Sequence, residues 1–289
     1  MARKGPERTF TRREALAMSL AGAAQIAAHQ PPPPAGWGVQ LYTVRDLIAR
    51  DPAATIAAIA AMGYKELEII QPTLPVVVPL ALKNGLTIVS AHLDEPTARG
   101  EGFQDFLSRA RASGIHYVVV PWVPPAERPT DRSGFERLAD RLNRMGEQAA
   151  KAGLQLCYHN HAFEFGRDAA GTRWLDVMMG SARAPLVQLE LDVFWVAITG
   201  AQPVEMINQY RDRVALMHLK DKSPDAPAQL RESDVAHSSC RDVGSGALDF
   251  KAIITAARSA GTQHFFVEHD WPPDPLQTLR ASYKFLAKL

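Results

Sequence analysis

From Trp37 onward, short apolar runs alternate with longer segments whose apolar residues recur at helical spacing. The runs are nearly continuous, which is typical of parallel strands covered on both faces. Strands that alternate with helical segments indicate successive β-α-β units. We expect strands at residues 38–42, 66–70, 87–92, 117–122, from 154, 187–192, 214–218 and 264–268.

The helical segments between these runs are often closed by glycine, as at Gly85, Gly114 and Gly153. We expect helices at residues 47–62, 74–84, 103–113, 132–152, 174–180, 203–210, 250–260 and 275–288. No Gly-x-Gly-x-x-Gly follows the first strand and no phosphate loop occurs, so an open nucleotide-binding sheet is disfavoured. The pattern therefore predicts a single (β/α)8 TIM barrel in the α/β class.

The segment before the barrel has a different composition. Five basic residues precede Glu14, and a weakly hydrophobic, alanine-rich run covers 15–28. This order is typical of a cleavable secretory signal, and Arg12-Arg13 resembles the twin-arginine type. We expect a signal peptide at 1–28, a proline-rich spacer at 29–36 and the catalytic barrel at 37–289. The prediction is export to the periplasm, with no stable membrane span after signal removal.

Charge and cysteine content narrow the class of protein. The 289 residues carry 32 basic and 31 acidic side chains, a balance that argues against a nucleic-acid binder. Two cysteines do not make a disulfide framework. Cys157 is expected to be a buried apolar residue, and its pairing with Cys240 in an oxidising compartment is left open. Homo-oligomerisation is left open as well.

Ionisable residues gather where the later strands are expected to end. Asp192, His218 and Glu268 end the sixth, seventh and eighth strands. In a β/α barrel the carboxyl ends of the strands carry the chemistry. Mixed carboxylate and imidazole donors suit one divalent ion such as Mn²⁺, Zn²⁺, Co²⁺ or Fe²⁺. The sequence therefore predicts a site for one divalent metal ion, and Mg²⁺ is a further candidate for that ion.

The fifth strand should supply the fourth ligand, and it offers three candidates. His159, His161 and Glu164 all follow the apolar run that begins at Leu154. One of them is expected to complete the metal site. His161 and Glu268 are the candidate acid and base for a proton transfer.

Other polar and aromatic residues are expected to shape the pocket. Lys220 follows His218 by two residues, so both point to one side of an extended strand, where a cation could hold an oxyanion. A solvated ion pair with Asp221 is the alternative for Lys220. The candidate substrate contacts at or just past strand ends are Gln40, His92, Trp122, His159 and Trp195.

Several motifs together carry a family resemblance. They are Gly38 to Arg45, Gly63-Tyr64 with Glu66 to Glu68, Tyr158 to Phe165, Leu191 to Trp195, His218 to Asp221, Val243 to Gly246 and Glu268 to Asp270. With these motifs the chain resembles the xylose isomerase-like barrel superfamily, in the group of sugar phosphate isomerases/epimerases. The resemblance spans Trp37 to Leu289. That superfamily includes isomerases, epimerases, inosose dehydratases, endonucleases and 3-keto-glycoside lyases or hydratases.

The resemblance also implies a ligand set. The superfamily's usual metal ligands are Glu, Asp, His and Glu from strands 5 to 8, and Asp192, His218 and Glu268 match three of them. Strand 5 departs, because His159 stands near the usual glutamate position and Glu164 lies further on. We expect Glu164 as the fourth ligand, with His159 as the alternative.

These observations predict an exported, metal-dependent sugar isomerase or epimerase, or a keto-sugar lyase or hydratase. The expected substrate is a free sugar or a keto-glycoside, and the shared step is removal of a proton next to a carbonyl. A barrel that binds carbohydrate without catalysis is the alternative, motivated by the altered fifth strand. A metal-dependent nuclease is disfavoured by the near-neutral charge.

Overall fold

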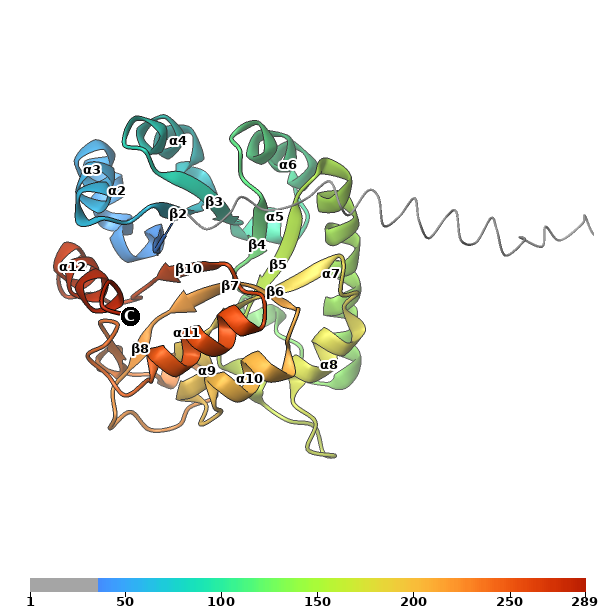
Figure 1. The fold of residues 1–289 in the computed structure, drawn as a ribbon. Helices are drawn as coiled ribbons and strands as arrows, with labels where there is room; N and C mark the ends of the chain where they lie inside the picture. Colours follow the sequence, from blue (N-terminus) through green and yellow to red (C-terminus); the bar gives the residue numbers. More distant parts are fainter. Residues whose placement is uncertain (1–35) are drawn as a thin grey trace, which may run out of the picture. The chain divides into compact units, whose positions relative to one another are not determined.

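The computed structural model describes residues 36–289 and shows a closed barrel of parallel strands surrounded by helices (Figure 1). The strand order around the barrel is β1-β10-β7-β6-β5-β4-β3-β2. The barrel strands are β1 (Gly38–Gln40), β2 (Glu66–Ile70), β3 (Thr87–His92), β4 (Tyr117–Val120), β5 (Gln155–His159), β6 (Val187–Asp192), β7 (Val214–Leu219) and β10 (His264–Val267). The predicted (β/α)8 barrel is confirmed.

The larger helices lie outside the ring of strands (Figure 1). They are α3 (Pro52–Met62), α4 (Leu74–Lys83), α6 (Phe103–Ala112), α7 (Arg132–Ala152), α8 (Trp174–Ser181), α10 (Pro203–Gln209), α11 (Phe250–Ser259) and α12 (Pro275–Leu286). Within residues 36–289, three short helices accompany them: α2 (Arg45–Arg50), α5 (Glu95–Ala98) and α9 (Val193–Ile198).

Local side-chain caps explain where the elements differ from the expected bounds. The first strand stops at Gln40, whose Oε1 accepts the N–H of Tyr42 at 2.6 Å and starts a turn of 3₁₀ helix. The helix expected over 47–62 is two helices, because Asp51 caps α3 by accepting the N–H of Ala54 at 2.9 Å. Helix α9 was not expected, and Asp192 caps it.

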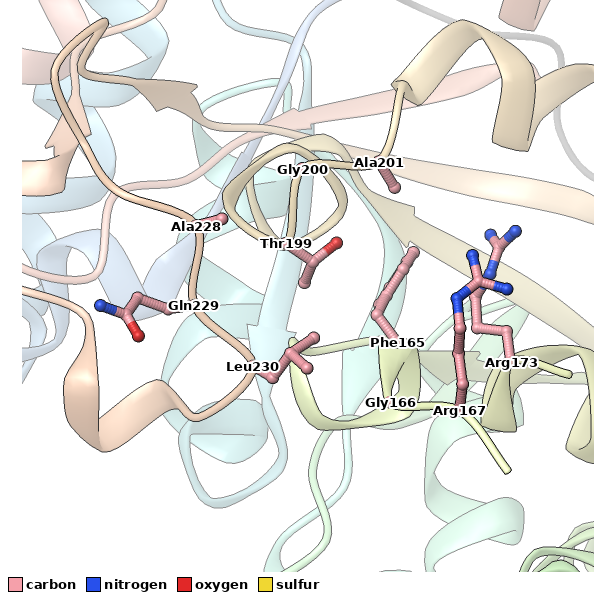
Figure 2. Close-up of a pocket in the computed structure, with 10 residues that line it drawn as sticks. All are labelled: Phe165, Gly166, Arg167, Arg173, Thr199, Gly200, Ala201, Ala228, Gln229 and Leu230. Carbon is pink, nitrogen blue, oxygen red and sulfur yellow. The ribbon is translucent and has the colours of Figure 1, made fainter. Parts of the chain in front are cut away.

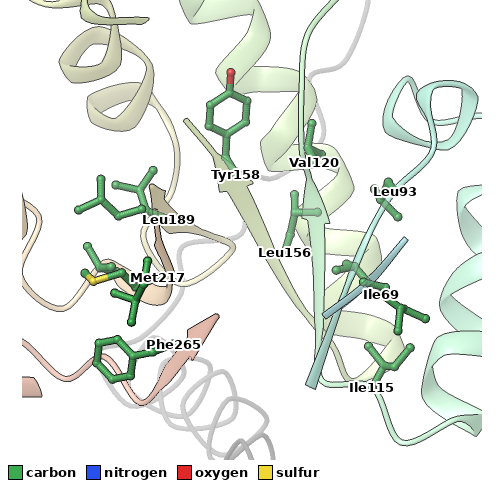
Figure 3. Packing of buried hydrophobic residues seen from close by; sticks show 14 of the residues in the cluster. Ile69, Leu93, Ile115, Val120, Leu156, Tyr158, Leu189, Met217 and Phe265 are labelled. Carbon is green, nitrogen blue, oxygen red and sulfur yellow. The ribbon is translucent and has the colours of Figure 1, made fainter. Parts of the chain in front are cut away.

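The main hydrophobic core lies between the strands and the surrounding helices. Figure 3 shows part of it, with Leu156 and Leu189 among the labelled side chains. A smaller apolar cluster has members on β3, β4, β5, β7 and β10: Val89, Tyr117, Val119, Cys157, Leu216 and Phe266. Cys157 and Cys240 are both buried and free.

A long segment joins β7 to α11, and one carboxylate organises it. The segment contains a two-stranded antiparallel sheet of β8 (Asp221–Lys222) and β9 (Cys240–Arg241). Asp221 accepts four backbone N–H groups, two of them from Gly244 and Gly246 at 3.0 and 2.8 Å. The alternative of a surface Lys220–Asp221 pair therefore does not describe the role of Asp221.

Residues 1–35, on which the export-signal prediction rests, lie outside the described residues. Among residues 36–289, no helix has the length and apolar character needed to cross a membrane.

Candidate metal centre

Ionisable side chains lie in the interior of the barrel near the small apolar cluster. Several occur as pairs two residues apart, on a strand or at its carboxyl end, and in an extended chain residues at this spacing share one face. The pairs are Glu66 and Glu68, Glu190 and Asp192, His218 and Lys220, and Glu268 and Asp270. All these residues except Asp270 are buried.

One set of these side chains forms what we call the outer group: His159, Asp192, His218 and Glu268. One donor atom from each lies within 4.8 Å of the others, and all four residues are buried. Nδ1 of His218 is 3.0 Å from Oε2 of Glu268. Oδ2 of Asp192 makes no hydrogen bond, although its Oδ1 accepts the N–H groups of Phe194 and Trp195.

This donor set fits a divalent ion. Two imidazoles and two carboxylates suit Mn²⁺, Zn²⁺, Co²⁺ or Fe²⁺. Oδ2 of Asp192 is a buried acceptor that faces the ammonium of Lys220 at 3.0 Å without a well-directed hydrogen bond, so it keeps the capacity to bind an ion. Three predicted ligands, Asp192, His218 and Glu268, are thus brought together from β6, β7 and the end of β10.

The structure places Glu164 apart from the outer group, among other partners. Its Oε1 accepts the hydroxyl of Tyr158 at 2.6 Å, and its Oε2 accepts the N–H of His161 at 2.9 Å. Burial raises the pKa of Glu164 from its usual 4.5 to about 8. The fifth-strand residue that stands among the other donors is His159.

Lys220 lies among the carboxylates of this region. Its Nζ is 3.0 Å from Oδ2 of Asp192 and 2.8 Å from both Oε2 of Glu268 and Oδ2 of Asp270. Burial opposes the charged form, but these carboxylates outweigh it and raise the pKa of Lys220 well above its usual value. Burial likewise opposes ionisation of Glu268, yet Lys220 and His218 lower its pKa. Glu268 is therefore a weak proton acceptor.

A cavity of about 430 Å³ opens beside these groups. Among the predicted site residues that line it are His92, Trp122, His159, His161, Trp195 and Glu268. Burial and the charge of Lys220 hold the pKa of His161 well below its usual value, so its imidazole is neutral near pH 7. Nδ1 of His161 and Nε1 of Trp195 are buried without a hydrogen-bond partner. Both side chains line the cavity, and these two atoms lie buried behind its surface.

Gln40 is the predicted contact that does not line this cavity. It is fully buried, its Nε2 donates to Glu68 at 3.3 Å, and its Oε1 caps the turn after β1. Its side chain contacts the interior of the barrel, so its placement differs from that of the other predicted substrate contacts.

Sequence reasoning also missed several residues of the site. Tyr42, Asp270 and Trp271 line the cavity, and Glu68 and Glu190 lie below the outer group. The two-residue spacing of Glu190 and Asp192, and of Glu268 and Asp270, was a usable signal.

A second cavity of about 510 Å³ lies elsewhere on the barrel. Figure 2 shows its lining, which includes Phe165, Arg167, Arg173 and Leu230. No histidine or carboxylate lines it. It offers no proton acceptor or ion ligand, so it is a poor candidate for proton-transfer chemistry.

A family model for the xylose isomerase-like TIM barrel matches residues 54–289. The chain belongs to this family. Among solved structures, a sugar phosphate isomerase/epimerase from Parabacteroides distasonis superposes with a TM-score of 0.73 at 21% identity, covering 88% of this chain and 98% of that one. The 3-keto-D-glucoside 4-epimerase from E. coli superposes with a TM-score of 0.57 at 19% identity, covering 79% of this chain and 91% of that one. At these identities the likeness concerns the fold.

The curated relatives include the inosose dehydratase of Lacticaseibacillus casei. It is 28% identical over 160 residues, which is 53% of this chain and 52% of that protein. The chain thus spans about half the length of the curated relative it matches.

Proposed function

We propose that this family member is an enzyme that removes a proton from the carbon next to a carbonyl of a sugar or keto-sugar. The observation that carries the proposal is His161: a neutral imidazole with an unpartnered Nδ1 lines the same cavity as Glu268 and Asp270. The similarity to an inosose dehydratase and the barrel shared with isomerases and epimerases support the same substrate class.

His159, Asp192, His218 and Glu268 would hold a divalent ion. Such an ion would supply Lewis-acid polarisation of a carbonyl or hydroxyl oxygen of the sugar. Of the two candidates on the fifth strand, we favour His159 over Glu164, because Glu164 is engaged by Tyr158 and the backbone of His161.

His161 is the proposed proton acceptor. Its imidazole is uncharged near pH 7, whereas the lowered pKa of Glu268 makes that carboxylate a weak base. Glu164 fixes the start of the turn that carries His161 by accepting the N–H of that residue. Nζ of Lys220 is 2.8 Å from both Glu268 and Asp270, so its ammonium offsets the negative charge that these two cavity-lining carboxylates bring to the substrate.

The aromatic lining agrees with a sugar. Trp122, Trp195 and Trp271 line the cavity, and their faces suit the C–H surfaces of a pyranose while Nε1 of Trp195 can donate to a hydroxyl. The volume of about 430 Å³ lies within the range for small-molecule sites.

Solvent exchange tests the proton-removal step whatever the final product is. Purified protein loaded with Mn²⁺ is incubated with free sugars, inososes and 3-keto-glycosides in D₂O, and deuterium entry next to the carbonyl is followed by NMR. We expect exchange in the wild type and a loss of about 10²–10⁴-fold in His161→Gln. Leu230→Ala in the second cavity is the matched control and should keep the wild-type rate.

A carbohydrate-binding barrel without catalysis is the second candidate. The observation that favours it is the ammonium of Lys220, which already contacts Asp192 and Glu268 of the outer group. Sugar binding by calorimetry with no deuterium exchange on any substrate class would support this candidate and contradict the enzymatic one.

We also propose that the chain is exported by its Arg12-Arg13 segment. In a bacterial host, the full chain should appear in the periplasm in a shortened form, as judged by fractionation and mass spectrometry. Replacing both arginines by lysine should retain it in the cytoplasm. Equal periplasmic amounts of the two chains would rule out the twin-arginine route.

A further inference from the structure

The two interior histidines His159 and His218 present their ring nitrogens to carboxylates on opposite sides. Nε2 of His159 is 3.9 Å from Asp192, whereas its Nδ1 is 3.2 Å from Oε2 of Glu190. Nδ1 of His218 is 3.0 Å from Glu268, whereas its Nε2 is 3.3 Å from the same Oε2 of Glu190. Each ring therefore lies between an outer carboxylate, Asp192 or Glu268, and the carboxylate of Glu190 on its other side.

A second set of donors forms what we call the inner group: His92, His159, Glu190 and His218. Its donor atoms also lie within 4.8 Å of one another, and all four residues are buried. Three imidazole nitrogens surround Oε2 of Glu190, at 2.7 Å from His92, 3.2 Å from His159 and 3.3 Å from His218. Two donors of a tetrahedral Zn²⁺ are about 3.3 Å apart, close to the 3.2 and 3.3 Å that separate Oε2 of Glu190 from His159 and His218.

Unpartnered atoms mark the inner group independently. Nδ1 of His159 and Oε1 of Glu190 are buried and make no hydrogen bond. His159 is 3% exposed and Glu190 fully buried, so water does not compensate these atoms from outside. Leaving buried polar atoms unsatisfied costs free energy, which a bound cation would recover.

We propose that the inner group is a second binding position for a transition-metal ion, alternative to the outer group. A neutral imidazole has one nitrogen lone pair free for a ligand bond, and the other nitrogen carries a proton. An inner ion would use Nδ1 of His159 and Nε2 of His218. The opposite nitrogens then carry the protons: Nδ1 of His218 can donate to Glu268 at 3.0 Å, as is usual for metal-bound histidine, and Nε2 of His159 faces Asp192 at 3.9 Å.

The two positions exclude each other for the same reason. An outer ion would use Nε2 of His159 and Nδ1 of His218, which leaves the N–H groups directed at Glu190 and Glu68. Filling both positions at once would require both rings to lose both protons. One ion per chain is therefore expected, in one position or the other.

The donor atoms determine which ion takes which position. Three imidazoles and one carboxylate in the inner group favour Cu²⁺ and other nitrogen-preferring ions, whereas the two imidazoles and two carboxylates of the outer group suit Mn²⁺ better. Two members of each group line the cavity: His92 and His159 in the inner group, and His159 and Glu268 in the outer group. The identity of the ion would thus decide which of these cavity-lining donors it engages.

Counting nitrogen ligands tests this inference. The purified chain receives one equivalent of Cu²⁺, and pulsed electron paramagnetic resonance counts the coupled imidazoles. We expect three imidazoles in the wild type, two in His92→Gln and three in Asp192→Asn. Two imidazoles in the wild type, with no change in His92→Gln, would overturn the proposal.

A Mn²⁺ titration supplies the matched comparison. Loss of an outer ligand in Asp192→Asn should weaken Mn²⁺ binding by at least about tenfold, while His92→Gln should leave it within about twofold. A larger loss of Mn²⁺ affinity in His92→Gln than in Asp192→Asn would contradict the assignment of Mn²⁺ to the outer group. Simultaneous binding of two Cu²⁺ per chain, one in each group, would contradict their exclusion.

Glu190→Gln should weaken Cu²⁺ binding by at least about tenfold, which gives a result even where His92→Gln folds poorly by circular dichroism. The inference shares its histidines with the proposed function, but neither titration uses a sugar. Absence of deuterium exchange on sugars would contradict that function and leave the nitrogen count unaffected.

Discussion

Lys220 contributes positive charge to the outer group, beside the imidazole of His218. Its ammonium lies within 3.0 Å of carboxylate oxygens of Asp192, Glu268 and Asp270. The side chain is fully buried, so water screens these charges little. Removing Lys220 would leave buried carboxylates that lack this counter-charge.

We therefore predict that Lys220→Met lowers the free energy of unfolding by about 3–5 kcal/mol in chelator-treated protein. Added Mn²⁺ should restore part of that loss, since a divalent ion replaces the missing positive charge. Urea unfolding with and without Mn²⁺ measures both effects. Lys251→Met, at an exposed position of α11, is the control and should change little. Equal stability of the two variants would refute the role of Lys220.

A second residue-level prediction concerns pH and Glu164. Burial raises the pKa of Glu164 from 4.5 to about 8 in the folded chain. Between these values the unfolded chain releases a proton that the folded chain keeps, so the stability that is complete below pH 4.5 is lost as pH rises toward 8. The slope is at most about 1.4 kcal/mol per pH unit.

Glu164→Gln removes this titration, because the amide has no proton to release. We expect the unfolding free energy of the variant to fall less than that of the wild type between pH 5 and 8 (roughly the interval set by the raised pKa). Chemical unfolding at a series of pH values gives the two curves. Parallel curves would show that Glu164 is not the group responsible.

At the scale of single elements, the sequence was sufficient to predict helix ends where a capping side chain or a glycine marks them. Helix α7 has the predicted bounds, because Asp131 accepts the N–H of Gly134 and Gly153 adopts a left-handed conformation with φ of 81°. Helix α9 was missed, because Asp192 was assigned only to the metal site although its Oδ1 also caps that helix.

The same limits apply to the candidate site. Asp192, His218 and Glu268 could be found from sequence, since barrel strands direct their carboxyl ends to one face. The position of Glu164 could not, because it depends on the 3₁₀ turn Phe163–Phe165 after β5. Glu68 was not assigned either, since the spacing of a strand shows which residues share a face but not which face is interior.

Helix α7 also yields a prediction about packing. A Cβ on Gly146 would lie 2.6 Å from the backbone oxygen of Leu186, a contact that requires the helix or the segment before β6 to move. Gly146→Ala should therefore destabilise the chain, although alanine is favoured over glycine in helices by about 1 kcal/mol. Gly180→Ala in α8 is the control, because nothing lies within 4 Å of its added Cβ.

Thermal unfolding of the two glycine variants measures the difference. We expect a lower melting temperature for Gly146→Ala, and an unchanged or higher one for Gly180→Ala. A rise in both would mean that helix propensity outweighs the contact between α7 and Leu186.

At the scale of the whole barrel, the outer group joins strands that are neighbours in the ring. His159 is on β5, Asp192 on β6 and His218 on β7, and Glu268 directly follows β10. These strands are consecutive in the barrel order. An ion bound there would hold four adjacent strand ends together, so binding should stabilise the closed barrel as a unit.

We predict that metal binding is visible as a change in thermal stability. At an ion concentration 100-fold above the dissociation constant, binding adds about 2.7 kcal/mol to the stability of the folded state. For a domain of about 250 residues this corresponds to roughly 5–11 °C in melting temperature. Chelator-treated wild type should show this rise on addition of Mn²⁺, measured by differential scanning calorimetry.

The paired variants decide whether the outer group is responsible. Asp192→Asn and Glu268→Gln each remove a carboxylate ligand while keeping the side-chain shape, so their melting temperatures should respond little to Mn²⁺. Glu205→Gln, in the first turn of α10, is the control and should keep the wild-type response. A full response in both ligand variants would place the Mn²⁺ elsewhere, because an ion cannot stabilise the barrel through ligands that it has lost.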